Sequence, residues 1–514
     1  MIEQILSGLS MVLVPQNLLW AFAGVAFGMI LGSIPGLTDN MGIVLFLPFT
    51  FYLSPIAGIA MLMGLTKGGN FGGSIPAVLF NIPGTPQAMV TCMDGYPLAQ
   101  QGKSGKALKQ ALYSSVVADA CSDLILIFLA APVAMVALKI GPPEYTSIII
   151  FSLIVISVAA SEYPIQGVFA VILGLFLGTV GTDPEFGTTR LIFHTLDLAD
   201  GFHIMPMVIG MLAFSEVLLQ LEKELLKRLE KRFSKANAAG AGGAGNSAVK
   251  ALAEDHSLSW REFRETLPTV FRSTGIGAAI GIIPGIGTTV GSYLSYIMAK
   301  QASKNPDKFG KGALEGIAAA EAGNNAVNGP NLIPLVTLGI PGNLAAALIL
   351  GGFMIKGLIP GPTFMQTNGD MLYALFIVLF LSNIFTLGIG YFYIKHVKNV
   401  ASISKPYLFT GIIVFSVIGS YVNYASVFDV FVMLAFAVLG YVLTKFRVNL
   451  PTVIVAFFLG PMLESKFRQA LKISGDDLTV FFTKPISLAF LVFTVVAVIF
   501  LLRKKNAMAR NKVK

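Results

Sequence analysis

The chain has 514 residues, of which 55% are hydrophobic and 12% are charged, and its mean hydropathy is +0.75. A soluble domain carries roughly a quarter charged residues, so this composition excludes a soluble globular protein. The formal net charge of +9 lies mostly in loops and in the C-terminal tail, without a DNA-binding motif, so we expect no nucleic-acid partner.

The first half starts with residues 1–16, which lack the features of a cleaved signal peptide and are expected to be retained at the membrane interface. A segment at 21–53 predicts a re-entrant hairpin, because its Pro-Gly pair interrupts an apolar stretch and unwound backbone in hydrocarbon must bond inside the protein. A broken transmembrane helix at 56–98 and a basic loop follow. Apolar spans near 110–138, 145–160, 164–180 and 202–220 complete a first membrane repeat, residues 1–221.

A polar segment, residues 222–272, divides the chain. It contains the Ala- and Gly-rich run 236–249, a composition that cannot bury an apolar face. We therefore expect a flexible linker between two membrane halves, and its positive residues place it in the cytoplasm.

The second half, residues 273–470, has the same order of elements. A hairpin is expected at 273–299 with its tip at 283–286, then a broken helix at 314–357 and spans at 371–394, 406–424, 428–444 and 449–463. The last segment, residues 471–514, holds a span at 485–502 and a basic tail that should be cytoplasmic. The sequence thus predicts an all-α polytopic integral membrane protein.

The two halves also share short motifs. The run Gly32-Ser-Ile-Pro-Gly36 has a counterpart in Gly281-Ile-Ile-Pro-Gly285. Further on, each half has an Ile-Pro pair that is followed at the same spacing by Ile-Pro-Gly. These motifs are Ile75-Pro76 with Ile82-Pro83-Gly84, and Ile333-Pro334 with Ile340-Pro341-Gly342. In that register Asn70 lies opposite Asn328, and Thr85 lies opposite Asn343. Internal duplication explains this order best.

Loop charges indicate that the two repeats are inverted. Arg272 and the lysines between 300 and 311 flank the second hairpin, which should therefore have both ends in the cytoplasm. The first hairpin has no flanking positive charge and should open outward. Four residues do not fit, because this topology places them outside: Lys356, Lys466, Arg468 and Lys472.

Inverted repeats with broken helices at the bilayer midplane are typical of secondary transporters, in which half-helix N-termini face anionic groups. Pro83 should end one helix, and Thr85 should cap a new helix that starts at Pro86. Asn343 should act likewise in the second half. A Pro-Gly pair is also compatible with a simple kink, and small residues with close helix packing. The candidate substrate-binding residues are Lys67, Asn70, Pro83, Gly84, Thr85, Thr288, Thr289, Asn324, Asn325, Pro341, Gly342 and Asn343.

Oxygen-bearing side chains at the hairpin tips suit an alkali cation better than a transition metal. Glu321 falls at membrane depth, where a carboxylate is expected to be structural or linked to a cation. Lys67 should either neutralise a substrate carboxylate or pair with Asp39. The candidate cation-coupling residues are Thr38, Asp39, Asn40, Glu321 and Asn328, and we expect no cofactor or metal beyond a coupling Na⁺ or H⁺.

At these residues the sequence resembles the large permease subunit of the tripartite tricarboxylate transporter family. The resemblance is carried by Tyr296–Lys300, Phe309–Gly316, Glu321–Asn325 and Leu332–Gly342 in the second half, and by Gly72–Thr85 and Asp94–Gly102 in the first. It extends from about Gly24 to Pro461. Lys67, Asn70 and Pro76 depart from the family's usual residues, which leaves the substrate open.

The resemblance implies a bacterial inner-membrane carrier that works with a small integral membrane subunit and a periplasmic substrate-binding protein. It also implies uptake of citrate-like or other carboxylates, driven by a sodium or proton gradient. Together with the residues above, it predicts a secondary transporter, not an enzyme, whose hairpins and broken helices move in an elevator-like way. A homo-oligomer is possible. An ion channel or a cation antiporter of similar architecture is the alternative.

Overall fold

The computed structural model describes residues 2–34, 37–160, 164–183, 185–234, 257–400, 405–422 and 424–513. Pro35 and Gly36 of the first Pro-Gly motif and the linker run 236–249 lie outside these ranges. Within them, six helices are long and apolar enough to cross a membrane, and several shorter apolar helices accompany them. The β-structure in the described ranges is one antiparallel pair, β1 (Gly181–Thr182) and β2 (Thr189–Arg190). The predicted all-α polytopic membrane fold is confirmed.

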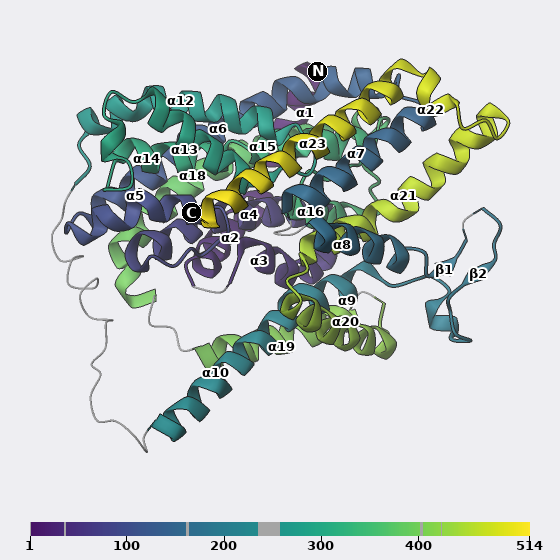
Figure 1. Cartoon of the computed structure of the whole chain (residues 1–514), viewed down its shortest axis with the longest axis horizontal. Coiled ribbons are helices and arrows are strands. Elements are labelled where there is room, and N and C mark those ends of the chain that lie inside the picture. Colours follow the sequence, from purple (N-terminus) through teal and green to yellow (C-terminus); the bar gives the residue numbers. More distant parts are fainter. Residues whose placement is uncertain are drawn as a thin grey trace.

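The first half is built mainly of helices (Figure 1). They are α1 (Ile2–Val12), α2 (Pro15–Gly32), α3 (Asp39–Phe46), η1 (Leu47–Tyr52), α4 (Pro55–Phe80), α5 (Ala88–Gln100), α6 (Ser104–Ala137), α7 (Pro142–Ala160), α8 (Pro164–Leu177), η2 (Leu196–Leu198), α9 (Ile204–Val208), the π-helix η3 (Ile209–Phe214) and α10 (Ser215–Ser234).

The second half is also built of helices in the described ranges. Its helices are α12 (Trp260–Gly281), α13 (Gly287–Ala302), η5 (Pro306–Lys308), α14 (Leu314–Asn325), α15 (Asn328–Leu338), α16 (Leu344–Ile355), α17 (Phe364–Thr367), α18 (Gly369–Val400), α19 (Lys405–Val422), α20 (Val427–Lys445), α21 (Leu450–Ser474), α22 (Val480–Thr483) and α23 (Pro485–Val513). Both described ends of the polar segment, in α10 and α12, are therefore helical.

Glycines allow α2 to lie very close to α4. A Cβ atom on Gly28 or Gly32 would meet the backbone of α4, and one on Gly68 or Gly72 would meet the backbone of α2. Small residues at such positions let two helix backbones approach closely in a membrane. The first hairpin is thus held against the broken helix that follows it.

The second hairpin turns where the sequence predicts. Between α12 and α13, Gly285 and Gly287 have φ of 92° and 75°, in the left-handed region that glycine adopts without strain. Gly277 and Gly291 pack on Gly323 of α14, so this hairpin also lies against its broken helix. The closely packed glycines let hairpin and broken helix lie directly against each other in each half.

The two broken helices end in the same backbone conformation. Helix α4 ends at Asn81 (φ 56°) with the Ile82 amide donating to Pro76 O at 3.3 Å. Helix α15 ends at Gly339 (φ 70°) with the Ile340 amide donating to Pro334 O at 3.2 Å. This is the left-handed termination that satisfies the last carbonyls of a helix. The matching motifs therefore fold alike.

Of the four basic residues that did not fit the predicted topology, Arg468 and Lys472 have acidic partners, whereas Lys356 donates to the carbonyls of Phe51 and Leu53 and Lys466 donates to Gln469. Helix α21 continues past its expected end to Ser474, and Arg468 pairs with Asp183 at 3.1 Å. Lys472 pairs with Glu185, a hydrogen bond that lowers the pKa of this carboxyl. Arg468 and Lys472 thus join α21 to the β1–β2 turn, at the end of the molecule away from α5 and α12 (Figure 1).

The close packing of α2 on α4 leads to a stability prediction. Gly68→Ala should destabilise the protein by about 1–3 kcal/mol, because the new methyl group would collide with the backbone of Val25 and Met29. Gly388→Ala is the matched control, since no atom lies within 4 Å of its Cβ position. Thermal unfolding of both variants in detergent measures the difference. Equal melting temperatures would contradict the packing argument.

Candidate functional site

Each hairpin reaches the break of its own half. In the second half, the Gly285 amide at the hairpin tip donates to Gly342 O at 2.7 Å. In the first half, Gly84 lies against the Gly32 carbonyl at the end of α2, and its amide donates to Gly73 O at 3.1 Å. Loop backbone in the breaks is thus hydrogen-bonded within the protein, as hydrocarbon requires.

The half-helix after the second break begins as predicted, but the one after the first does not. Asn343 caps α16 and accepts a hydrogen bond from the Ala346 amide at 2.9 Å. Helix α5 begins at Ala88 and not at Pro86, because residues 85–87 form a turn in which the Ala88 amide bonds to Thr85 O. The prediction that Thr85 caps α5 is therefore wrong. The Thr85 hydroxyl is buried against Gly73 and has no hydrogen-bond partner in the described ranges.

Two asparagines join the halves at the centre of the molecule. Asn70 Nδ2 on α4 donates to Asn328 Oδ1 on α15 at 3.1 Å, and Gln87 Nε2 donates to Asn70 Oδ1 at 2.8 Å. The aligned motifs place Asn70 opposite Asn328, so residues in equivalent positions of the two halves are in direct contact.

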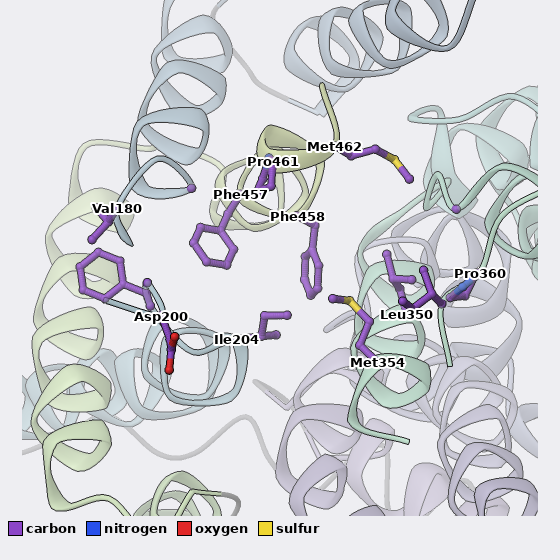
Figure 2. A pocket seen from close by; sticks show the side chains of 15 residues that line it. Val180, Asp200, Ile204, Leu350, Met354, Pro360, Phe457, Phe458, Pro461 and Met462 are labelled. Atoms are coloured by element: carbon purple, nitrogen blue, oxygen red, sulfur yellow. The ribbon is translucent and has the colours of Figure 1, made fainter. Parts of the chain in front are cut away.

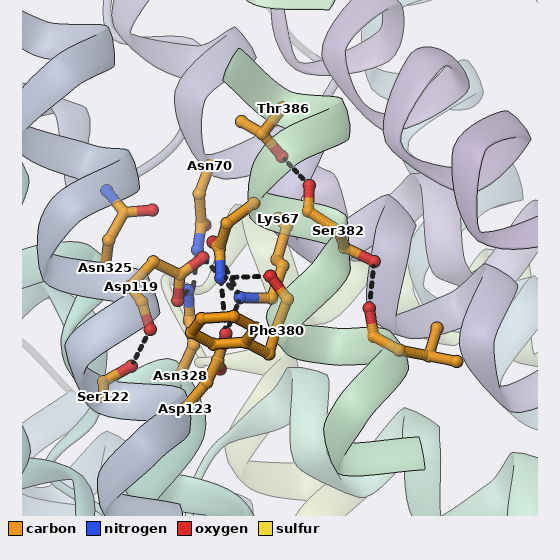
Figure 3. A network of polar contacts seen from close by, with 12 residues as sticks. Lys67, Asn70, Asp119, Ser122, Asp123, Asn325, Asn328, Phe380, Ser382 and Thr386 are labelled. Atoms are coloured by element: carbon orange, nitrogen blue, oxygen red, sulfur yellow. Dashed lines mark hydrogen bonds and ion pairs between the residues drawn. The ribbon is translucent and has the colours of Figure 1, made fainter. Parts of the chain in front are cut away.

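Beside these amides, Lys67 of α4 is fully buried between two aspartates of α6 (Figure 3). Its Nζ lies 2.7 Å from Asp119 Oδ2, 2.7 Å from Asp123 Oδ2 and 3.1 Å from Asn383 Oδ1 of α18. Asn383 Nδ2 donates to Asp123 Oδ2 at 2.6 Å. The predicted pairing of Lys67 with Asp39 is wrong, because the α6 carboxylates hold its ammonium group. We call Lys67, Asp119, Asp123 and Asn383 the lysine cluster.

A small cavity extends from the lysine cluster to the second break. It measures about 20 Å³, and its polar lining is Thr66, Lys67, Asn328, Asn331 and Asn343. About 10–15 Å³ suffices for one water molecule, so the cavity accommodates a single water-sized group. One end of it is the capped N-terminus of α16, where free amides and the helix dipole favour negative charge.

Glu321 of α14 lies in a second buried polar cluster. Its Oε1 accepts hydrogen bonds from Ser74 at 2.7 Å and from Thr91, and its Oε2 accepts one from Ser115 at 2.9 Å. Asn325 donates back to the Glu321 carbonyl at 2.9 Å. Both side-chain polar atoms of Asn324 are buried and lack partners in the part of the chain described. Glu321 therefore joins α14 to α4, α5 and α6.

The first hairpin brings oxygen atoms into the interior. Thr38 caps α3 by accepting from the Met41 amide at 3.3 Å. Asp39 Oδ1 and Asn40 Oδ1 are buried without hydrogen-bond partners among the described residues. In the second hairpin, by contrast, Thr288 is half-buried and Thr289 is exposed. The two tips are therefore not equivalent in their polar groups.

A larger pocket of about 330 Å³ lies between α8, α16 and α21 and borders Gly339 at the second break (Figure 2). Its lining is mostly apolar, including Met354, Phe457 and Phe458, and its charged residue is Asp200. An apolar wall with a negative group would repel a carboxylate, so we do not assign the anion site here.

The sequence analysis missed Asp119, Asp123, Asn383 and Asn331. A signal for the aspartates was present, because Asp119 and Asp123 are four residues apart and share one face of an apolar span. The two amides have no comparable signal. In the described ranges no group of His, Cys, Asp and Glu could hold a metal ion, and Cys92 and Cys121 are free.

A model of the tripartite tricarboxylate transporter TctA family matches residues 18–455. One relative, an uncharacterised 52.8 kDa protein in the TAR-I ttuC' 3' region of Agrobacterium vitis, is 33% identical over 513 residues, which is 100% of this chain and 98% of the relative. A second uncharacterised protein, from the TAR-II ttuC' 3' region of the same organism, is 35% identical over 237 residues, 46% of this chain and 98% of its own length. No solved structure matches the chain.

The lysine cluster leads to a second stability prediction. Lys67→Met should destabilise the protein by about 3–5 kcal/mol, because it leaves two buried carboxylates without their ammonium partner. The triple variant Lys67→Met, Asp119→Asn, Asp123→Asn removes the unpaired charges and should recover most of the lost stability. Thermal unfolding in detergent compares the two. A triple variant no more stable than Lys67→Met would show that charge pairing is not the cause.

Proposed function

Because the chain belongs to the tripartite tricarboxylate transporter TctA family, a family of transporter subunits and not of enzymes, we propose that it takes up small organic anions, tricarboxylates or dicarboxylates, together with Na⁺ or H⁺. The observation that carries this proposal is the contact between the capped N-terminus of α16 and a cavity that a buried ammonium group lines. Both groups attract carboxylates.

The anion site in this proposal lies where the two breaks meet. Gly342 and Asn343 present the α16 N-terminus, and Lys67 supplies a positive charge from the opposite half. Asn70, Asn328 and Asn331 offer amide donors beside it. Pro83, Gly84 and Thr85 in the first break, and Pro341 in the second, keep the backbone open at this depth, and Asn324 adds an unpartnered amide.

The coupling cation has oxygen ligands available. Asp39 Oδ1 and Asn40 Oδ1 are buried and unpaired within the described ranges, and Thr38 precedes them. Carboxylate, amide and hydroxyl oxygens suit hard cations. Glu321 and Asn328 are the second-half candidates, and unwound backbone carbonyls at broken helices often complete such sites.

We further propose that the two halves are inverted repeats whose hairpins and broken helices move together as an elevator-like core. Asp94 of α5 supports a single core: its Oδ1 accepts from the Gly310, Gly312 and Ala313 amides at 2.8–2.9 Å, and its Oδ2 accepts from Tyr296 at 2.8 Å. The first broken helix is thereby tied to the second hairpin and to the start of α14.

In the proposed system the protein is a multi-pass subunit of the bacterial inner membrane, with its linker and C-terminus in the cytoplasm. It receives the anion from a periplasmic substrate-binding protein and assembles with a small membrane subunit, as the family's tripartite organisation suggests. An ion channel or a cation antiporter is the competing function, but a water-sized cavity beside the capped N-terminus of α16 favours binding over open conduction.

The central test is transport by the reconstituted three-part system. Proteoliposomes with an inward Na⁺ or H⁺ gradient should accumulate radiolabelled citrate or succinate, and uptake should saturate with concentration. A channel would give non-saturating flux that never exceeds equilibrium. Absence of gradient-driven accumulation of any tricarboxylate or dicarboxylate would rule out the proposed function.

One substitution can separate the proposed role of the α16 N-terminus in anion binding from the role of Asn343 as its helix cap. Asp caps a helix about as well as Asn, so Asn343→Asp should keep the fold while repelling an anion. We expect its half-saturating anion concentration to rise by at least about tenfold, equivalent to about 1.4 kcal/mol. The half-buried Asn368→Asp at the start of α18 is the control and should leave uptake unchanged. If Asn343→Asp has the affinity of the wild type, the anion does not bind at this helix end.

A further inference from the structure

The lysine cluster has one positive charge fewer than its negative charges require. Lys67, Asp119 and Asp123 are at most 5% exposed, and two carboxylates share one ammonium group. Asp123 Oδ1 is buried and has no hydrogen-bond partner in the described part of the chain. Buried charges without partners are strongly unfavourable, so a further cation would be stabilised between these carboxylates.

The same ammonium group faces the proposed anion site. Lys67 lines the cavity that reaches Asn343 and the amides of the α16 N-terminus. A lysine side chain is flexible and carries its charge at the tip, so small rotations redirect it. Lys67 thus stands between two aspartates on one side and a site for a carboxylate on the other.

The cluster also joins the proposed core to its surroundings. Lys67 belongs to broken helix α4, whereas the aspartates belong to α6 and Asn383 belongs to α18. Another charged group that packs against α6 is Glu321 of α14, which accepts a hydrogen bond from Ser115. Helix α15 contributes the amide of Asn328, 3.4 Å from Asp119 Oδ1.

We propose that Lys67 couples anion binding to cation binding by exchanging partners. In the described arrangement Asp119 and Asp123 hold its ammonium group. When a monovalent cation, Na⁺ or H⁺, binds between the two aspartates, Lys67 turns to the carboxylate of an anion at the α16 N-terminus. This inference rests on the proposed function and adds a cation site to it.

The exchange makes coupling obligatory on electrostatic grounds. An anion alone cannot attract Lys67 away, because two bare carboxylates would remain buried. Once a monovalent cation lies between them, it takes the place of the ammonium group and the net charge of the cluster stays the same. The ammonium group is then released, and the ion pair between α4 and α6 opens. The ion pair at Lys67 thus stops holding α4 to α6 only when both solutes are bound.

The decisive variant is Asp123→Asn, which removes one of the two negative charges and so imitates the cluster with its cation bound. In proteoliposomes with the partner subunits, the variant should still exchange radiolabelled citrate or succinate across the membrane. Accumulation driven by the gradient should fall at least about tenfold, within the usual range of coupling between sites. Exchange in the variant should no longer depend on Na⁺ or on pH, and separate Na⁺ and H⁺ gradients in the wild type identify the cation.

Two controls keep the outcomes distinct. Asp429→Asn removes another buried aspartate, which pairs with His203 far from the cluster in sequence, and should retain gradient-driven uptake. For variants that do not reconstitute, thermal shift measures binding of the same anion to the purified protein. This binding should require the cation in the wild type and not in Asp123→Asn. Cation-dependent accumulation by Asp123→Asn, or cation-dependent binding to it, overturns the exchange of partners. Failure of the wild type itself to accumulate any carboxylate overturns the proposed function instead.

Discussion

The constraint behind this architecture is that every backbone polar group at membrane depth needs a partner inside the protein. Helices α4 and α15 both stop inside the molecule, and at each stop a left-handed residue lets the following amide donate to a carbonyl near the helix end, Pro76 O or Pro334 O. The neighbouring hairpin supplies the remaining partners, as the bond from the Gly285 amide to Gly342 shows. Glycine contacts also let each hairpin pack closely against the broken helix of its half.

Charge follows from the same constraint. Once backbone is unwound in the interior, side chains of opposite sign can be buried there, provided that they satisfy one another. Asp94 and Glu321 are fully engaged, by three amides and a phenol in one case and by three hydroxyls in the other. Lys67 differs, because its partners exceed it in charge and it borders a cavity. In the proposed mechanism Lys67 responds to solutes, whereas Asp94 and the hydrogen bonds of Glu321 join elements together.

The sequence predicts the fold well because its signals are local. Span length, the turn at Gly285 and the cap at Asn343 are each set by a few neighbouring residues. The site is harder to predict because it depends on which helices touch. Lys67 could be assigned to a substrate or to Asp39, and only the packing of α6 on α4 brings Asp119 and Asp123 to it. Thr85 fails as a cap because the turn at 85–87 delays α5 by two residues, a difference that composition cannot show.

The hydrogen bonds that Asp94 accepts from the second half have a consequence for how the polypeptide is assembled. This carboxylate, the Lys106–Glu262 ion pair at 2.6 Å and the amide contact between Asn70 and Asn328 all join residues before the linker to residues after it. None of these bonds needs the covalent connection between α10 and α12. Two separately synthesised polypeptides, one ending after α10 and one starting before α12, contain all the complementary surfaces and should recognise each other in the bilayer as subunits of a heterodimer.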